Sequence, residues 1–127
     1  PRIEGDFASL LRAVATGADF EAPRLSADTT MTVIVAARGY PGTPAKGGAI
    51  DGLSAAEQVD GVTVFQAGTS LRDGRLVASG GRVLAVTGRG RSLGEARDRA
   101  YRAVEAIDFA DGFHRRDIGW RELERAS

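Results

Sequence analysis

The chain has 127 residues, which allows one domain with a modest core, and its composition of 43% hydrophobic and 27% charged residues is that of a folded protein. Seventeen basic and seventeen acidic side chains cancel, so no net charge would draw the chain to nucleic acid or to an anionic membrane. The absence of cysteine excludes disulfides and thiolate metal sites and fits a cytoplasmic protein, and no apolar run is long enough to span a bilayer.

The first segment, residues 6–16, has the pattern of an amphipathic helix. Asp6 is suited to the N-cap and Gly17 to the C-terminal stop. The apolar positions recur at helical spacing: Phe7, Leu10, Leu11 and Val14. We expect this stripe to pack on the core. Residues 18–30 are polar and include Pro23, and they are expected to form an irregular linker.

An apolar run, Met31–Ala37, predicts a buried strand that ends in a loop at residues 38–48. This loop contains four of the 17 glycines, two of the four prolines and the only lysine, Lys46. A strand that ends in such a loop can present backbone N–H groups and one cation to a ligand. The same composition is also found in ordinary surface turns, and the residues alone leave both interpretations open.

The second half of the chain alternates strands with two helices. Ser54 and Glu57 have capping-box spacing, which predicts a short helix, and residues 62–65 follow as a strand. The pair Asp73-Gly74 predicts a type I′ turn between strands at 69–72 and 75–78.

A further strand is predicted over residues 82–89 and a helix over 93–107, opened by a second capping box at Ser92 and Glu95. The predicted fold class is therefore α+β: a mostly antiparallel sheet with hairpins, packed by helices.

No catalytic constellation is complete. His114 is the only histidine, and a surface or partly buried position accounts for it. With no cysteine and scattered carboxylates, we expect no catalytic residue and no metal ligand in this chain. Three patches remain as ligand candidates, because each contains glycines or basic side chains that can bind an anion. They are residues 39–48 with Lys46, residues 79–82, and residues 115–117.

In their order along the chain, these patches resemble the C-terminal domain of the phosphoribosylamine–glycine ligase family. The members of this family are ATP-grasp enzymes of purine biosynthesis. The resemblance extends over nearly the whole chain. The residues that carry it are Gly39-Tyr40-Pro41, Lys46-Gly47, Gly61-Val62, Ala67-Gly68-Thr69, Asp73-Gly74, Gly80-Gly81-Arg82-Val83-Leu84 and Arg115-Arg116-Asp117-Ile118-Gly119. It implies the fold of the C-terminal domain of ATP-grasp ligases, which is like that of the biotin carboxylase C-domain.

The resemblance also implies an activity. The family phosphorylates the carboxylate of glycine with ATP, and the amine of 5-phosphoribosylamine then attacks the acyl phosphate, with ADP and phosphate released. ATP and Mg²⁺ are thus implied for the full-length enzyme, and neither is expected to bind to this fragment alone. The family's magnesium-binding Glu-x-Asn motif, its ATP-grasp lid and its amino-terminal domain correspond to sequence upstream of Pro1.

The chain begins at Pro1 without methionine, and we expect it to be the C-terminal part of a longer polypeptide. Residues 1–17 would be the end of the preceding ATP-grasp region, 18–30 a linker and 31–127 the C-terminal domain. Its expected partners are the missing domains of the same polypeptide, with glycine and 5-phosphoribosylamine as substrates.

Two alternatives stay open at this point. One is the related domain of biotin-dependent carboxylases, and the other is a stand-alone binding or interaction module. Under the ligase hypothesis, we expect the loop at residues 39–47 to face the active-site cleft and to help hold glycine or the ribosyl phosphate. The expected substrate-binding residues are Gly39, Tyr40, Pro41, Gly42, Lys46, Gly47, Gly80, Gly81, Arg82 and Arg116. For Arg116 with Asp117, an ion pair that docks the tail onto the domain is an equally good explanation.

Overall fold

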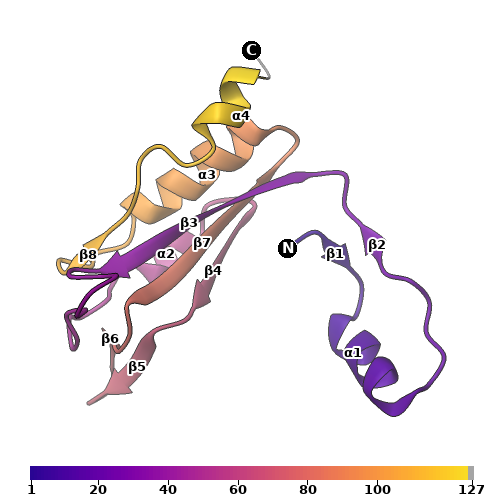
Figure 1. Cartoon of the computed structure of the whole chain (residues 1–127), viewed down its shortest axis with the longest axis horizontal. Coiled ribbons are helices and arrows are strands. Elements are labelled where there is room, and N and C mark those ends of the chain that lie inside the picture. Colours follow the sequence, from indigo (N-terminus) through magenta and orange to yellow (C-terminus); the bar gives the residue numbers. More distant parts are fainter. Residues whose placement is uncertain (126–127) are drawn as a thin grey trace.

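The computed structural model describes residues 1–125 of the chain. Helices and runs of one or more strands follow one another along it (Figure 1). In chain order the elements are β1 (Ile3–Glu4), α1 (Phe7–Thr16), β2 (Arg24–Leu25), β3 (Thr29–Ala37), α2 (Leu53–Glu57), β4 (Val62–Gln66), β5 (Thr69–Arg72), β6 (Arg75–Ala78), β7 (Arg82–Gly90), α3 (Leu93–Glu105), β8 (Gly112–Phe113) and α4 (Trp120–Arg125).

The centre of the fold is an antiparallel sheet with the strand order β4-β7-β3-β8. Strand β7 lies between β4 and β3, and its apolar run makes it the most buried strand, with Val83, Leu84 and Val86 at most 1% exposed. The hairpin β5–β6 forms a separate two-stranded sheet. The predicted α+β class with a mostly antiparallel sheet is confirmed.

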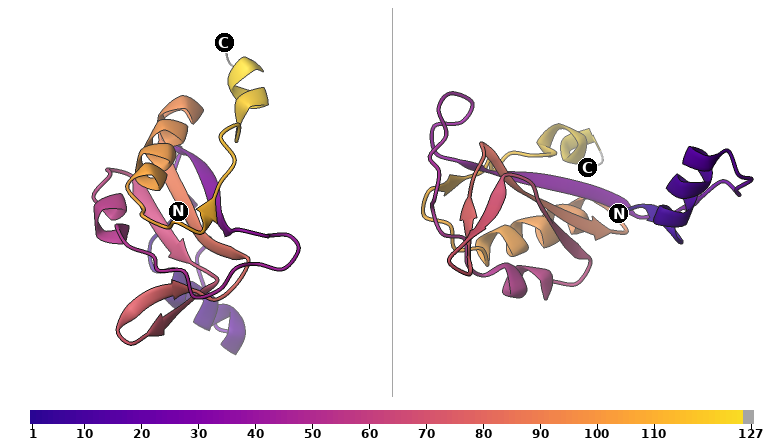
Figure 2. Two further views of the ribbon diagram at one scale, coloured as in Figure 1. Left: turned by 90° about the vertical axis from the view of Figure 1, so that its left-hand side faces the viewer. Right: turned by 90° about the horizontal axis from the view of Figure 1, so that it is seen from below.

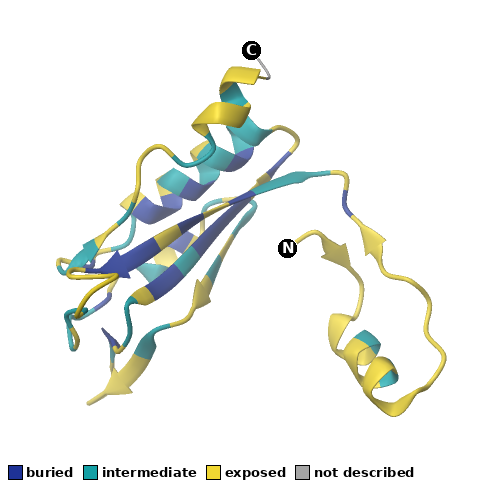
Figure 3. Cartoon of the chain, in the orientation of Figure 1, coloured by how far each residue is buried: buried dark blue, intermediate teal, exposed yellow. Residues whose placement is uncertain are grey.

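Helix α3 covers one face of the sheet, as the two views in Figure 2 illustrate. The close approach depends on glycine, because a Cβ on Gly88 would collide with the carbonyl oxygen of Ala96 and lie 2.7 Å from the nitrogen of Ala100. Ala96, Ala100 and Ala103 are fully buried on the facing side of the helix. Figure 3 shows this burial concentrated between the sheet and α3.

Several turn and capping residues adopt the structures that the sequence predicts for them. Asp73 and Gly74 both have positive φ angles, 51° and 76°, as a type I′ turn requires. The hydroxyl of Ser92 accepts a hydrogen bond from the N–H of Glu95 at 3.2 Å, so it caps α3. Asp6 caps α1 in the same way, and Gly17 ends that helix in the left-handed conformation.

Other expectations were wrong. Helix α1 does not pack on the core: none of its residues is buried, and it lies off the end of the sheet with β1 and β2 (Figures 1 and 3). The segment 18–30 is only partly irregular, because β2 pairs with β1 and β3 already begins at Thr29. Helix α2 begins after Gly52, so Ser54 lies inside the helix and does not cap it.

No helix among residues 1–125 is long and apolar enough to cross a membrane.

Candidate functional site

The loop at residues 38–48, which we call the glycine–proline loop, is fixed at the end of the sheet where β3 stops. On its way out, the N–H of Arg38 donates to the carbonyl of Asp111 at 2.7 Å. On its return, the N–H of Gly47 donates to Ala78 at 2.8 Å and the N–H of Ala78 donates to Gly48 at 2.9 Å. The loop is therefore held by Asp111, just before β8, on one side and by β6 on the other.

Tyr40 joins the glycine–proline loop to the second candidate patch. A Cβ on Gly81 would lie 2.5 Å from Cδ2 of the Tyr40 ring, so the ring packs directly on the backbone of Gly81. The carbonyl of Gly81 also accepts a hydrogen bond from the N–H of Ala37 at 2.8 Å. Gly80, Gly81 and Arg82 thus lie beside the loop, as a shared site would require. The Tyr40–Pro41 peptide bond is cis.

The loop has unpaired hydrogen-bond donors. Within residues 1–125, the N–H groups of Gly39, Gly42, Thr43 and Lys46 donate no hydrogen bond. The Lys46 side chain is exposed, and within the same residues neither it nor Arg82 forms an ion pair. Exposed amide donors and an unpaired cation can together bind an anionic group.

One cation at this site was missed by the sequence analysis. The Nη1 atom of Arg72 lies 3.4 Å from the position that a Cβ on Gly47 would occupy, so the guanidinium lies next to the glycine–proline loop. The hairpin signal at 69–78 predicts the turn after Arg72. It does not predict that β6 pairs with residues 47–49 and so carries Arg72 to the loop.

The third patch differs from what the sequence suggested. Asp117 forms its ion pair with Arg115, at 2.6 Å between Nη2 and Oδ2, and not with Arg116. The hydrogen bond from Arg115 lowers the pKa of the Asp117 carboxyl. The tail is also tied to α3, because the hydroxyl of Tyr101 donates to the carbonyl of Arg115 and accepts from the N–H of Ile118. Arg116 is exposed, and among the described residues 1–125 no hydrogen bond or ion pair joins it to the loop. The segment that contains it runs along α3 (Figure 1).

His114 lies against the aromatic ring of Tyr101, with ring centroids 6.0 Å apart. Partial burial is the main cause that lowers its pKa, and the charge of Arg116 acts in the same direction. This contact gives His114 a packing role between the tail and α3.

A magnesium site would require a group of oxygen ligands. No three His, Asp or Glu side chains come together within residues 1–125. Asp111, a carboxylate beside Gly48 of the loop, is paired with Arg38 at 2.7 Å. The side chains at this end of the sheet therefore do not fit the metal, and we assign no Mg²⁺ ligand among residues 1–125.

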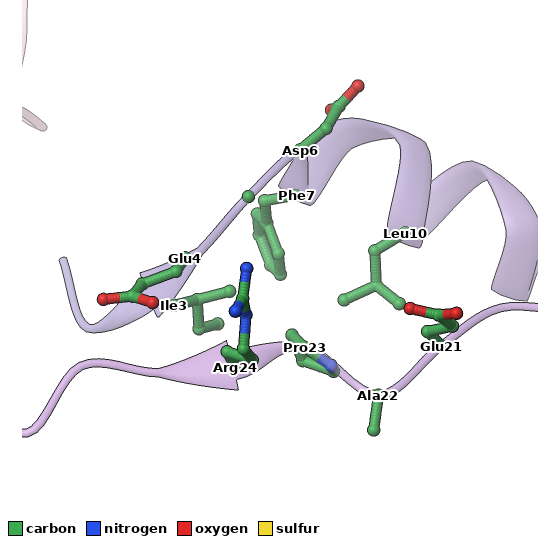
Figure 4. A pocket seen from close by; sticks show the side chains of 10 residues that line it. Ile3, Glu4, Asp6, Phe7, Leu10, Glu21, Ala22, Pro23 and Arg24 are labelled. Carbon is green, nitrogen blue, oxygen red and sulfur yellow. The ribbon is translucent and has the colours of Figure 1, made fainter.

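A hollow of about 560 Å³ lies beside α1 (Figure 4). Its walls are β1, the start of α1 and residues 21–24, and the side chains of Phe7, Leu10 and Pro23 are among those that line it. None of the expected substrate-binding residues lines this hollow.

Comparison with known proteins identifies the relatives of the chain. Residues 30–121 match the family model described as "Phosphoribosylglycinamide synthetase, C domain". The phosphoribosylamine–glycine ligase of Mesorhizobium japonicum is 49% identical over 99% of this chain, and that of Phenylobacterium zucineum is 52% identical over 98%. The chloroplastic enzyme of Arabidopsis thaliana is 48% identical over 98%.

A solved structure agrees with these sequence matches. The crystal structure of phosphoribosylamine–glycine ligase from Thermotoga maritima superimposes with a TM-score of 0.69 at 35% identity, over 87% of this chain and 27% of that one. The chain spans 30% of the length of the two bacterial relatives and 24% of the Arabidopsis one. The resemblance drawn from the sequence is therefore confirmed, and the chain belongs to the phosphoribosylglycinamide synthetase C-domain family.

Proposed function

We propose that this chain is the C-terminal part of an ADP-forming carbon–nitrogen ligase that joins glycine to 5-phosphoribosylamine, acting in the cytoplasm. The observation that carries the proposal is the alignment with ligases of that name over 98–99% of this chain. These relatives match along only 24–30% of their own length, so the chain corresponds to one part of such an enzyme. ATP and Mg²⁺ would bind to the upstream part, and this chain alone would be inactive.

The direct test is a ligation assay on the longer polypeptide that contains this sequence. We expect phosphate release that requires ATP, Mg²⁺, glycine and 5-phosphoribosylamine together, and no release when any one is omitted. The 127-residue chain, assayed in parallel, should release none. Release that does not depend on glycine, or a native polypeptide no longer than this chain, would contradict the proposal and favour a stand-alone binding module.

The division of the chain is part of the same proposal. Residues 1–17 would belong to the preceding ATP-grasp region, 18–30 would connect the two parts, and 31–127 would form the C-terminal domain. Two observations support this division: the family match begins at residue 30, and α1 buries no residue against the sheet. The hollow beside α1 (Figure 4), which both apolar and charged side chains line, would then face the upstream region.

We further propose that the glycine–proline loop binds a substrate, either the carboxylate of glycine or the phosphate of the ribosyl group. Lys46 supplies the charge, the free N–H groups supply donors, and Gly80–Arg82 lie beside them through the Tyr40–Gly81 contact. Arg72 joins this set. Arg116 is the weakest candidate, because within residues 1–125 no hydrogen bond or ion pair connects it to the loop.

Steady-state kinetics on the longer polypeptide can test the role of Lys46. Loss of a charge-assisted hydrogen bond costs about 1.5–3 kcal/mol, so Lys46→Met should raise KM for one of the two substrates at least ~10-fold. The matched control is Arg91→Met, since Arg91 is a well-exposed cation beyond the opposite end of β7. Unchanged KM values for both substrates in Lys46→Met would exclude Lys46 from the site.

A further inference from the structure

The sheet has one face that α3 does not cover. Gly88 and Gly90 of β7 point toward α3, so the alternate residues of β7 point away from it. The strand register aligns one such residue, Ala85, with Ile34 of β3 on one side and Phe65 of β4 on the other. These three side chains form an apolar row across the uncovered face, which we call the open face.

The neighbouring row on the open face is also uncharged. There Thr87 of β7 aligns with Thr32 of β3 and Thr63 of β4. The hydroxyls of Thr32 and Thr87 share one hydrogen bond at 2.8 Å, so one of their two O–H donors is satisfied within the sheet, and Thr87 is only 4% exposed. This bond reduces the desolvation cost of covering the row.

The open face differs from the usual solvated side of an antiparallel sheet. Such a side normally carries polar and charged residues. Charged residues make up 27% of this chain, yet neither row contains one. Ile34 is 37% exposed and Phe65 is 45% exposed. An apolar centre without charge and with an aromatic residue is typical of a protein–protein interface.

At the end nearest α1, the open face is fixed to residues 26–28, which join β2 to β3 and which we call the connector. Arg89 follows the two rows along β7 and forms an ion pair with Asp28 at 3.2 Å. Only residues 26–28 separate β2 from β3. The first of them, Ser26, accepts two hydrogen bonds at its carbonyl from the Arg2 side chain and donates one from its N–H to the Arg2 carbonyl. A domain that packs on α1 is therefore held close to the sheet.

We propose that the open face is the surface on which the upstream part of the same polypeptide docks. This inference rests on the proposed function, because it needs a longer chain of the length that the relatives have. The upstream part is the occupant favoured here: it enters through β1 and α1, whose apolar side chains are also uncovered, and the short connector keeps it beside the sheet. The face toward α3 is already filled, so the open face is the one left for it.

The test uses thiol labelling, since the chain has no cysteine of its own. Phe65→Cys is placed in the longer polypeptide, and its alkylation rate is measured by peptide mass analysis, native and in urea. Thr63→Cys gives a second reading from the adjacent row, in case the loss of Phe65 disturbs the fold. Leu71→Cys is the matched control, because Leu71 is an apolar residue that is 76% exposed on the hairpin β5–β6.

We expect native-state alkylation at residues 65 and 63 to be at least ~10-fold slower than in urea, as for groups that react only when an interface opens. At residue 71 we expect a native alkylation rate within about threefold of the rate in urea. That result would show that the reagent reaches this domain. The slow rates should not change on ~100-fold dilution of the protein, because the docking is intramolecular.

Two results would overturn the inference. Fast labelling at both residues 65 and 63 in the native polypeptide would show that the face is open to solvent. Protection that is lost on dilution would show that a second copy covers it. A polypeptide that is active in ligation but unprotected here fails only this inference, whereas one that is protected but inactive fails only the proposed function.

Discussion

Helices α1 and α3 have the same local design and opposite surroundings. Each has a side-chain N-cap, Asp6 or Ser92, and each has an apolar stripe. Yet α3 buries Ala96, Ala100, Ala103 and Val104, whereas α1 buries nothing and leaves large apolar side chains exposed: Phe7, Leu11 and Val14. An amphipathic pattern therefore predicts that a helix packs its apolar stripe on another surface. It does not predict which surface that is.

The composition of the two stripes explains why α3 fits this sheet. The buried residues of α3 are mostly alanines. These small side chains let the backbone of α3 lie directly against the glycines of β7. The stripe of α1 has larger side chains and no matching glycine-lined surface within residues 1–125. Under the proposed function, that surface belongs to the upstream region.

The largest expected difference between the two regions comes from leucine truncation. Leu84, which is 1% exposed, lies in the core with the residues that α3 covers, whereas Leu11 of α1 is 53% exposed. In the 127-residue chain, Leu84→Ala should lower the free energy of unfolding by about 3 kcal/mol, and Leu11→Ala by less than about 0.5 kcal/mol. Urea unfolding followed by circular dichroism measures both. Equal losses would show that α1 shares the core.

Overpacking should give a smaller difference in the same direction. Ala100→Leu forces a larger side chain against Gly88 and should cost about 2 kcal/mol, while the matched change Ala15→Leu on exposed α1 should be close to neutral. Thermal unfolding of the two variants gives the comparison. An unaffected Ala100→Leu would mean that α3 packs less closely on β7 than its glycine contacts imply.

The smallest expected effect is a pH dependence confined to α1. Hydrogen bonds from Ser9, first from its N–H and then from its hydroxyl, lower the pKa of the Asp6 carboxyl from its ordinary value of 3.8. A lowered pKa means that the folded helix favours the charged form. The stabilisation is therefore present above pH 3.8 and is lost as the pH falls through the folded-state pKa.

Nuclear magnetic resonance of the Ser9 amide should detect this loss as an acid transition in wild type. The transition should be absent in Asp6→Asn, whose side chain still caps but does not titrate. An acid transition of the Ser9 amide that persists unchanged in Asp6→Asn would contradict an origin in the Asp6 cap.

The sequence predicted those features that depend on neighbouring residues. Asp73 and Gly74 adopt the turn that their conformational freedom favours, and Ser92 caps the helix that follows it. Ser54 has the same spacing as Ser92, but Gly52 starts that helix two residues earlier and leaves no role for the serine. A capping box is thus a local preference that the path of the chain can override.

The features that could not be predicted depend on which segments meet in space. The Tyr40 ring on Gly81, and Arg72 beside Gly47, both follow from how β6, β7 and the loop come together. Arg115 and Arg116 are adjacent arginines, and Arg115 pairs with Asp117 in a segment that the Tyr101 hydroxyl fixes at Arg115 and Ile118. Periodicity carries no information on such pairings.

The most direct test of the account concerns the contrast between α1 and α3. Hydrogen exchange at the amides of residues 7–16 should be measured in this chain and in the longer polypeptide that contains it. We predict that exchange is at least ~10-fold slower in the longer polypeptide, because the upstream region covers the apolar stripe, while the amides of α3 change much less. Equal exchange of α1 in the two proteins would contradict the claim that this chain is one part of a larger folded enzyme.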